Sequence, residues 1–258
     1  MKQKILQVEN VTKNYGKGEQ QTAALQGISF DVLEGEFLGI MGASGSGKTT
    51  LLNCIATMIR PTAGKILLQE KNIAAFKGAK LAAYRGQQIG YLFQEFELLD
   101  NLTARENISL PAALHRMKPA DVEAALLSLA ERFAITDVLD KFPAQMSGGQ
   151  KQRVAAVRAL LSDPSIVLAD EPTGALDSKN SKTLMDQLAL IRKENHATIL
   201  MVTHDAHVAS YCTRILFIED GRLFHELRRD PLNETNEEFY ERIVLVMAQL
   251  GGGSRHVL

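Results

Sequence analysis

FLGIMGASGSGKTTLLNCIATMI, residues 37–59, is the stretch that determines the fold. It opens with a short apolar run, 37–41, of the kind that forms a strand buried on both faces of a parallel sheet. A glycine-rich turn follows, and the residues after it place apolar side chains at helical spacing. Those side chains are Leu51, Leu52, Ile55 and Ile59. The order of strand, glycine-rich turn and helix predicts an α/β domain.

The glycine-rich turn GASGSGKT, residues 42–49, matches the phosphate-binding pattern G-x-x-x-x-G-K-[ST]. Its glycines allow successive backbone N–H groups to converge on a phosphate, where a Cβ atom would obstruct the turn. The following helix directs the positive end of its dipole at the same anion. We expect Lys48 to reach the β- and γ-phosphates of a nucleotide and the Thr49 hydroxyl to bind Mg²⁺. The predicted nucleotide-binding residues of this turn are Gly42, Ala43, Ser44, Gly45, Ser46, Gly47, Lys48, Thr49 and Thr50.

A second motif, SIVLADE at 165–171, is an apolar strand that ends in two carboxylates. Asp170 stands where proteins with this loop hold Mg²⁺, directly or through water. Glu171 would project beside the γ-phosphate, where a carboxylate can orient a water molecule or accept its proton. An acidic pair at a strand end can also be a simple turn, but the phosphate-binding loop upstream favours the catalytic interpretation.

The rest of the chain alternates strands with helices. Residues 5–11 and 25–32 alternate apolar and polar side chains, which predicts strands with one solvated face. Further short apolar runs predict buried strands. The other predicted elements are strands at 89–93, 165–169, 197–203 and 214–218, a largely helical block at 95–160, a helix through Leu184, Leu188 and Ile191, and a hairpin at 219–221.

This order predicts an α/β fold: a P-loop NTPase (RecA-like) core with a mostly parallel sheet, an N-terminal antiparallel β portion and an inserted α-helical subdomain. We expect the nucleotide-binding core to comprise residues 1–94 and 161–227. The helical subdomain is expected at 95–160, and a C-terminal helical tail at 228–258.

The tail is expected to contain one helix at about 235–250. Thr235 and Glu238 fit a capping box at its start. Its apolar stripe consists of Phe239, Ile243, Met247 and Leu250. Such a stripe can pack on its own domain or bind a partner, and the sequence leaves both interpretations open.

Composition narrows the classes of partner. The 258 residues are 45% hydrophobic and carry a net charge of -1, so no basic field attracts the chain to nucleic acid. The two cysteines, Cys54 and Cys212, have no metal-ligand spacing and indicate a reducing compartment. No secretory signal or run of about 20 apolar residues is present in the sequence. If the protein acts at a membrane, another chain is expected to supply the span.

MSGGQ, residues 146–150, opens a predicted helix and resembles the signature of the ABC family, in which Leu is commoner at the place of Met146. Ser147, Gly148, Gly149 and Gln150 would present hydrogen-bond donors and a helix N-terminus to an anion. In the ABC family that anion is the γ-phosphate of ATP bound by the opposite subunit. The resemblance therefore implies ATP and Mg²⁺ as ligands and a second copy of the chain as partner.

Four more residues resemble ABC landmarks in the expected order. Tyr15 in KNYGKG is similar to the aromatic residue that stacks on adenine, although it can also be a simple strand-end tyrosine. Gln94 resembles the glutamine that contacts Mg²⁺ and water, Asp177 resembles the aspartate that links the two sites, and His204 resembles the histidine that touches the γ-phosphate. The resemblance implies that Lys48, Gln94, Glu171 and His204 are catalytic, and that Thr49, Gln94 and Asp170 hold Mg²⁺. Ala169, before Asp170, is smaller than usual for the family.

Longer stretches point to one branch of the family. MGASGSGKTTLLN, LFQEFELLDNLTARENI and ADEPTGALDSKNS resemble the macrolide-export, lipoprotein-release and bacitracin-resistance ATPases. GALDSK, the SYCTR segment and the tail with Phe239 and Tyr240 are most similar to the bacitracin-resistance (Bce-type) branch. This resemblance implies a peripheral protein on the cytoplasmic face of the membrane, a permease with a large extracytoplasmic domain, and a sensor kinase reached through that permease.

Three alternatives stay open at this point. Instead of peptide-antibiotic resistance, the chain can serve lipoprotein release, macrolide export or an importer. A soluble ABC ATPase is disfavoured, because that class has two nucleotide domains in one chain or a long coiled-coil insertion, and this sequence shows neither. A binding module without hydrolysis is disfavoured because Lys48, Asp170, Glu171 and His204 are all present.

Overall fold

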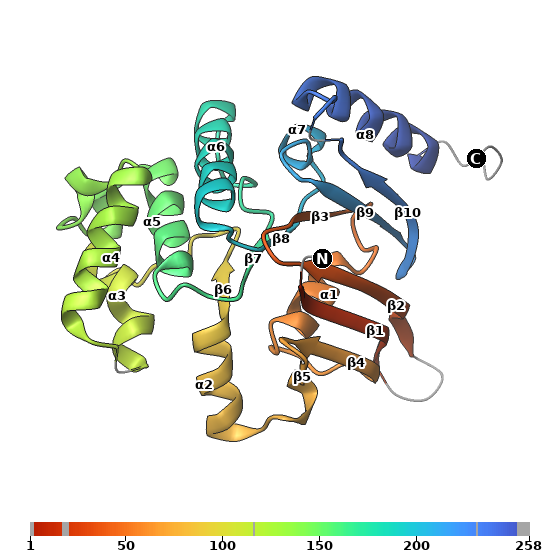
Figure 1. Ribbon diagram of the computed structural model, residues 1–258, viewed down its shortest axis with the longest axis horizontal. Helices are drawn as coiled ribbons and strands as arrows, with labels where there is room; N and C mark the ends of the chain where they lie inside the picture. Colours follow the sequence, from red (N-terminus) through yellow and green to blue (C-terminus); the bar gives the residue numbers. More distant parts are fainter. Residues whose placement is uncertain (1–2, 17–20, 116, 231, 252–258) are drawn as a thin grey trace.

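The computed structural model describes residues 3–16, 21–115, 117–230 and 232–251. A six-stranded sheet and a four-stranded sheet form its framework, and helices pack around them (Figure 1). Among the helices of the described ranges, none is both long enough and apolar enough to cross a membrane.

The six-stranded sheet consists of β3 (Phe37–Met41), β6 (Ile89–Leu92), β7 (Ile166–Asp170), β8 (Ile199–Val202), β9 (Arg214–Glu219) and β10 (Arg222–Arg228). Its order is β10-β9-β3-β8-β7-β6, and all neighbours are parallel except the hairpin of β9 and β10. All five residues of β3 are buried, because strands pair with both of its edges and hydrophobic clusters cover both faces. The buried strand predicted at 37–41 and the hairpin predicted at 219–221 are therefore confirmed.

The four-stranded sheet consists of β1 (Lys4–Tyr15), β2 (Thr22–Leu33), β4 (Ala63–Leu68) and β5 (Lys71–Asn72). Its order is β2-β1-β4-β5, and every pair is antiparallel. Helix α1 (Lys48–Ile55) packs between the two sheets. Its Leu51 and Leu52 share one hydrophobic cluster with Leu38 and Ile40 of β3 and with the inner side chains of the antiparallel sheet.

Helices cover the opposite face of the six-stranded sheet. Phe37 and Met41, which alternate with Leu38 and Ile40 along β3, share a second cluster with these helices. The helices are α3 (Ala104–Leu114), α4 (Pro119–Arg132), α5 (Gly148–Leu160), α6 (Ser178–Asn195), α7 (Ala206–Ala209) and α8 (Asn236–Gly251). Figure 1 shows α3, α4 and α5 gathered at one side of the molecule, with α8 on the side of β9 and β10. The domain boundaries at 94, 160 and 227 stay a prediction.

Four helices or strands have no counterpart in the predictions, namely β4, β5, α7 and α2 (Gly78–Gln88). No residue of helix α2 is buried. Helix α1 ends before Ile59, because Thr57 adopts a left-handed backbone with φ 61°. Short 3-10 turns lie at Ile73–Ala75, Thr136–Val138 and Pro143–Gln145.

The tail helix α8 begins with the predicted capping box. The Thr235 and Glu238 side chains exchange hydrogen bonds with each other's backbone N–H, at 2.8 and 3.2 Å. Phe239 and Ile243 are fully buried in the hydrophobic cluster between the six-stranded sheet and the helices that cover it, and Met247 packs against this cluster. The side chain of Leu250 lies outside the described residues. The tail helix thus packs on its own domain, one of the two interpretations left open above.

A buried ion pair fastens the turn before β3 to β9. The Arg214 guanidinium donates to both carboxylate oxygens of Glu36, at 2.7 and 3.2 Å, and the two side chains are 8% and 10% exposed. The same carboxylate accepts a hydrogen bond from the Leu33 N–H at 2.8 Å. Removing one member of such a pair leaves a buried charge without its partner.

Glu36→Ala should lower the free energy of unfolding by about 3–5 kcal/mol, because it removes the bidentate partner of the buried Arg214 guanidinium and leaves it only the longer ion pair with Glu226, at 3.4 Å. Urea denaturation measures this change. The control is Asp31→Ala, which removes the exposed ion pair with Lys4 and should cost at most about 1 kcal/mol. Equal effects of the two substitutions would contradict this assignment of the buried pair.

Candidate active site

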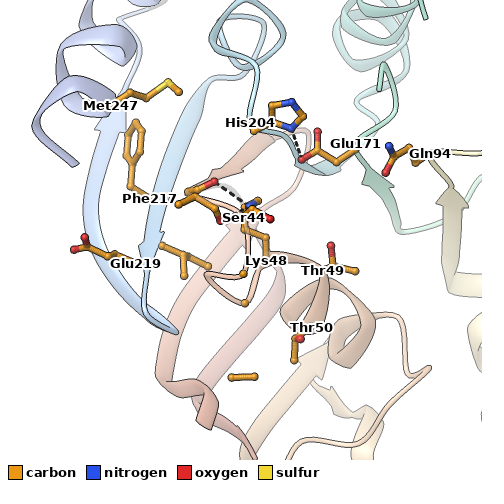
Figure 2. Close-up of a pocket in the computed structure, with 16 residues that line it drawn as sticks. Ser44, Lys48, Thr49, Thr50, Gln94, Glu171, His204, Phe217, Glu219 and Met247 are labelled. Carbon is orange, nitrogen blue, oxygen red and sulfur yellow. Dashed lines mark hydrogen bonds and ion pairs between the residues drawn. The ribbon is translucent and has the colours of Figure 1, made fainter. Parts of the chain in front are cut away.

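A cavity of about 800 Å³ opens at the carboxyl ends of the parallel strands. The phosphate-binding loop follows β3, Gln94 follows β6, Glu171 follows β7, and His204 follows β8, so the strand ends bring distant residues to one place. Figure 2 shows their side chains around the cavity. Its lining consists of Ala24, Gly42, Ala43, Ser44, Gly45, Gly47, Lys48, Thr49, Thr50, Gln94, Glu171, His204, Phe217, Ile218, Glu219 and Met247.

The loop leaves no room for side chains at two of its glycines. A Cβ atom on Gly42 would lie 2.1 Å from the carbonyl oxygen of Ile218, and one on Gly47 would lie 2.4 Å from that of Ala24. Gly47 is also left-handed, with φ 103°, at the start of α1. The loop therefore turns its backbone toward the cavity. The N-terminus of α1, which is the positive end of the helix dipole, lies at the same place.

The Lys48 side chain folds back onto the backbone of its own loop. Its ammonium donates hydrogen bonds to the carbonyl oxygens of Gly42 and Ala43, both at 2.9 Å. Burial lowers the pKa of Lys48, while the charges of Glu171 and Asp170 oppose that shift. A phosphate placed in the loop would offer this buried ammonium a charged partner in place of two neutral carbonyls.

Asp170 and Thr49 form an oxygen pair beside the loop. The Thr49 hydroxyl donates to the Asp170 carboxylate at 3.2 Å. Burial raises the pKa of Asp170, and the hydrogen bond from Thr49 opposes that rise. Within the described ranges, no three or more His, Cys, Asp or Glu side chains form a metal-binding group. The oxygen pair of Thr49 and Asp170 fits Mg²⁺, which is commonly held by one or two protein oxygens together with substrate phosphates.

Glu171 and His204 touch each other at the edge of the cavity. His204 Nδ1 lies 2.9 Å from Glu171 Oε1, and the two side chains are 71% and 15% exposed (Figure 2). Glu171 has a left-handed backbone with φ 46°, and its N–H donates to the carbonyl oxygen of Val202. Strained positions of this kind cluster at functional sites, and the hydrogen bond to β8 holds this one in place.

Gln94 approaches the same edge from β6. A Cβ atom on Gly174 would lie 2.9 Å from Gln94 Nε2, so the absence of a side chain there lets the amide pass close to the backbone. Gln94, Glu171 and His204 also line a second cavity, of about 850 Å³, which lies between α6, α7 and α8.

The signature residues lie outside the cavity that holds Lys48. Ser147 caps α5: its hydroxyl accepts from the Gln150 N–H at 3.3 Å, and the Gln150 side chain accepts from the Ser147 N–H at 2.9 Å. Ser147 and Gly148 are exposed at this helix end, whereas Gly149 is buried against Asn180. The first turn of α5 therefore faces solvent with its N–H groups and dipole.

Asp177 and Tyr15 also lie outside this cavity. Asp177 caps α6 by accepting from the backbone and side chain of Asn180, both at 2.8 Å, and these bonds lower the pKa of Asp177. Tyr15 ends β1 and is 44% exposed, and the Lys13 ammonium lies 5.1 Å from the centre of its ring. The roles assigned to both residues stay predictions.

Sequence reasoning missed the wall of the cavity formed by β9 and α8. Phe217 and Met247 lie beside each other there (Figure 2). The sequence indicated only that Met247 belongs to an apolar helix stripe and that Phe217 belongs to a buried strand. No local signal could have brought them to the nucleotide loop, because they reach it through packing across the sheet.

Known proteins of one family match this chain. The family model described as "ABC transporter" matches residues 25–174. The ABC transporter ATP-binding protein YxdL of Bacillus subtilis is 47% identical, over 97% of this chain and 96% of its own length. The bacitracin export ATP-binding protein BceA of Halalkalibacterium halodurans is 41% identical, over 96% of this chain and 97% of its own length.

A solved structure matches along most of the chain as well. The dimeric, post-hydrolysis ATP-binding cassette MJ0796 of Methanocaldococcus jannaschii, bound to ADP and Pi, has a TM-score of 0.80 at 37% identity. The match covers 87% of this chain and 99% of that one. The predicted P-loop NTPase fold is thereby confirmed. The chain belongs to the ABC transporter family, as one of its ATP-binding, ATP-hydrolysing proteins.

Proposed function

We propose that two copies of this chain enclose Mg-ATP between them and hydrolyse it to drive a separate membrane permease. The observation that carries this proposal is the separation of two sets of phosphate-binding groups on one chain. Lys48, Glu171 and His204 line one cavity, whereas the exposed Ser147 end of α5 lies outside it. A site that uses both sets is complete only when a second copy faces the first. The dimeric form of the MJ0796 cassette supports this arrangement.

In the proposed reaction, water attacks the γ-phosphorus of ATP, the bond from that phosphorus to the bridging oxygen breaks, and ADP and phosphate form. Glu171 orients the water and accepts its proton. Lys48 and His204 stabilise the negative charge on the transferring phosphoryl group. Ser147 and the start of α5 in the second copy act on the same charge from the other side.

Thr49, Asp170 and Gln94 are the residues that would hold Mg²⁺. The Thr49 hydroxyl and the Asp170 carboxylate already lie within hydrogen-bond distance, and Gln94 offers an amide oxygen at the same edge. When bound, Mg²⁺ neutralises phosphate charge and orients the phosphates. Tyr15 is half-exposed, and its ring would stack on adenine.

The loop after Gln94 is suited to transmit the state of the site to a permease. Phe96 and Glu97 both adopt left-handed backbones, and the Arg158 guanidinium donates to both of their carbonyl oxygens. Leu99, farther along the loop, is 48% exposed. Because Arg158 belongs to α5, this helix joins the exposed Ser147 end to the loop.

We infer that the permease belongs to the bacitracin-resistance branch and that the ATPase works at the cytoplasmic face of the membrane. BceA is similar along nearly the whole chain, including the tail. We further propose that this permease has a large extracytoplasmic domain and that the ATPase is linked to a sensor kinase through it.

Co-purification tests the coupling to a membrane. Tagged Glu171→Gln protein, isolated from native membranes with Mg-ATP, should retain a permease with a large extracytoplasmic domain. Deleting the gene should sensitise cells to bacitracin but not to a macrolide, and the wild-type gene, but not Glu171→Gln, should restore resistance. Recovery of ribosomes, or of no membrane protein, would contradict the coupling, and sensitivity to macrolides alone would move the chain to the export branch.

A further inference from the structure

Helix α7 begins two residues after His204 and is very short. It spans the four residues Ala206–Ala209, and the Asp205 side chain caps it by accepting from the His207 and Val208 N–H groups at 2.7 and 3.3 Å. A single helical turn is not stable by itself in water. The placement of α7, and of the chain segment that carries His204, therefore depends on what α7 packs against.

Helix α8 supplies that support. The Tyr240 ring stacks on the His207 imidazole, with centroids 4.0 Å apart and an interplanar angle of 8°. One residue before Tyr240, the fully buried Phe239 belongs to the same hydrophobic cluster as Val208 and Ala209 of α7. The capping box at Thr235 and Glu238 and the sixteen-residue length make α8 the firmer of the two helices.

Helix α8 also reaches the site on both sides of His204. Met247 lines the cavity of the phosphate-binding loop, and Tyr240 lines the second cavity between α6, α7 and α8. These two residues are seven positions apart and lie on one face of the helix. Both cavities share Glu171 and His204, so the face of α8 borders the catalytic pair from two directions.

The His204 side chain itself has little to hold it. It is 71% exposed, and its imidazole contacts the Glu171 carboxylate. Its position therefore follows from the backbone, which β8 holds before His204 and α7 holds after it. A shift of α7 would move the imidazole, whereas the phosphate-binding loop belongs to β3 and α1 and would stay in place.

We propose that Tyr240 is a positioning residue for ATP hydrolysis: its stack on His207 fixes α7 and thereby holds His204 at the γ-phosphate. This inference rests on the role proposed for His204. On this inference, α8 belongs to the active site and contributes to ATP turnover.

The test compares Tyr240→Ala with Tyr240→Phe. Tyr240→Ala should lower kcat for ATP hydrolysis about tenfold, since small displacements of a catalytic group are costly. The affinity for Mg-ADP should stay within twofold, because ADP lacks the phosphate that His204 touches. Tyr240→Phe keeps the ring and should restore kcat to within twofold of wild type. Leu245→Ala, at a 64% exposed position of the same helix, is the control and should leave kcat unchanged.

His207→Ala removes the other ring of the stack and should reproduce the kcat loss even if Tyr240→Ala fails to fold. Normal kcat in both alanine variants, or a parallel loss of kcat and Mg-ADP affinity without rescue by Tyr240→Phe, would overturn the inference. His204→Ala separates the two claims. If that variant turns over normally, the role proposed for His204 fails and the inference fails with it, whereas a slow His204→Ala beside a normal Tyr240→Ala overturns the inference alone.

Discussion

Glu171→Gln should bind Mg-ATP normally and hydrolyse it about 10²–10⁴ times more slowly than wild type, the range that a general base contributes. The amide has nearly the shape of the carboxylate but cannot accept the proton of the attacking water. Lys48 and the phosphate-binding loop are unchanged, so ATP stays bound and holds two copies together. Phosphate release measures the rate, and light scattering after gel filtration measures the mass with and without ATP.

Glu131→Gln, an exposed carboxylate on α4, is the matched control for this substitution and should behave as wild type in both measurements. Turnover by Glu171→Gln at more than a tenth of the wild-type rate would remove Glu171 from its role as base. A slow variant that stays monomeric with ATP would leave the chemistry intact but contradict the proposal that bound ATP joins two copies.

Ser147→Asp should abolish ATP-dependent dimers and lower turnover at least about 100-fold. Asp caps a helix as well as Ser does, so α5 should keep its start. Its carboxylate, however, would face the γ-phosphate of the opposite copy, and two anions at that distance repel each other. Binding of Mg-ATP to the monomer should persist, since Ser147 lies outside the cavity of Lys48.

The control for this charge effect is Ser147→Asn, which also caps helices and has almost the same shape as Asp but no charge. We expect it to keep a substantial part of the turnover. Light scattering of both variants in the Glu171→Gln background gives the dimer fraction directly. Equal loss in Asp and Asn variants would show that shape at this position matters and that the negative charge does not.

The phosphate-binding loop could be predicted from the sequence because its chemistry is local. The spacing from Gly42 to Thr49 places backbone donors, an ammonium and a hydroxyl within one turn. The strand that aims them lies directly before the turn, and the helix lies directly after it. The elements behind Glu171 and His204 were predictable for a related reason. Each residue follows a short apolar run, and parallel strands bring their carboxyl ends to one edge.

The contact between His204 and Glu171 could not be predicted in the same way. Both residues were expected near the γ-phosphate, but the 2.9 Å approach depends on the left-handed backbone of Glu171 and on its hydrogen bond to Val202. Such a conformation for a residue other than glycine has no signal in the pattern of apolar and polar residues.

The wall formed by Phe217 and Met247 was invisible for a different reason. An apolar residue on a strand or on a helix stripe is expected to be buried, and the pattern does not say against what. Helix α2 escaped prediction because its side chains are exposed or half-buried. Non-local packing, not local propensity, decides which apolar residues form the cavity wall.

The central claim, that each ATP site is built from two copies of the chain, is tested most directly by mixing two inactive variants. Lys48→Ala removes the ammonium of the phosphate-binding loop, and Ser147→Asp blocks the opposite half-site. In a mixed dimer, one of the two sites combines an intact Lys48 with an intact Ser147 and should hydrolyse ATP. We expect the mixture to hydrolyse ATP although each variant alone does not. A mixture as inactive as its two components would contradict a site built from two copies.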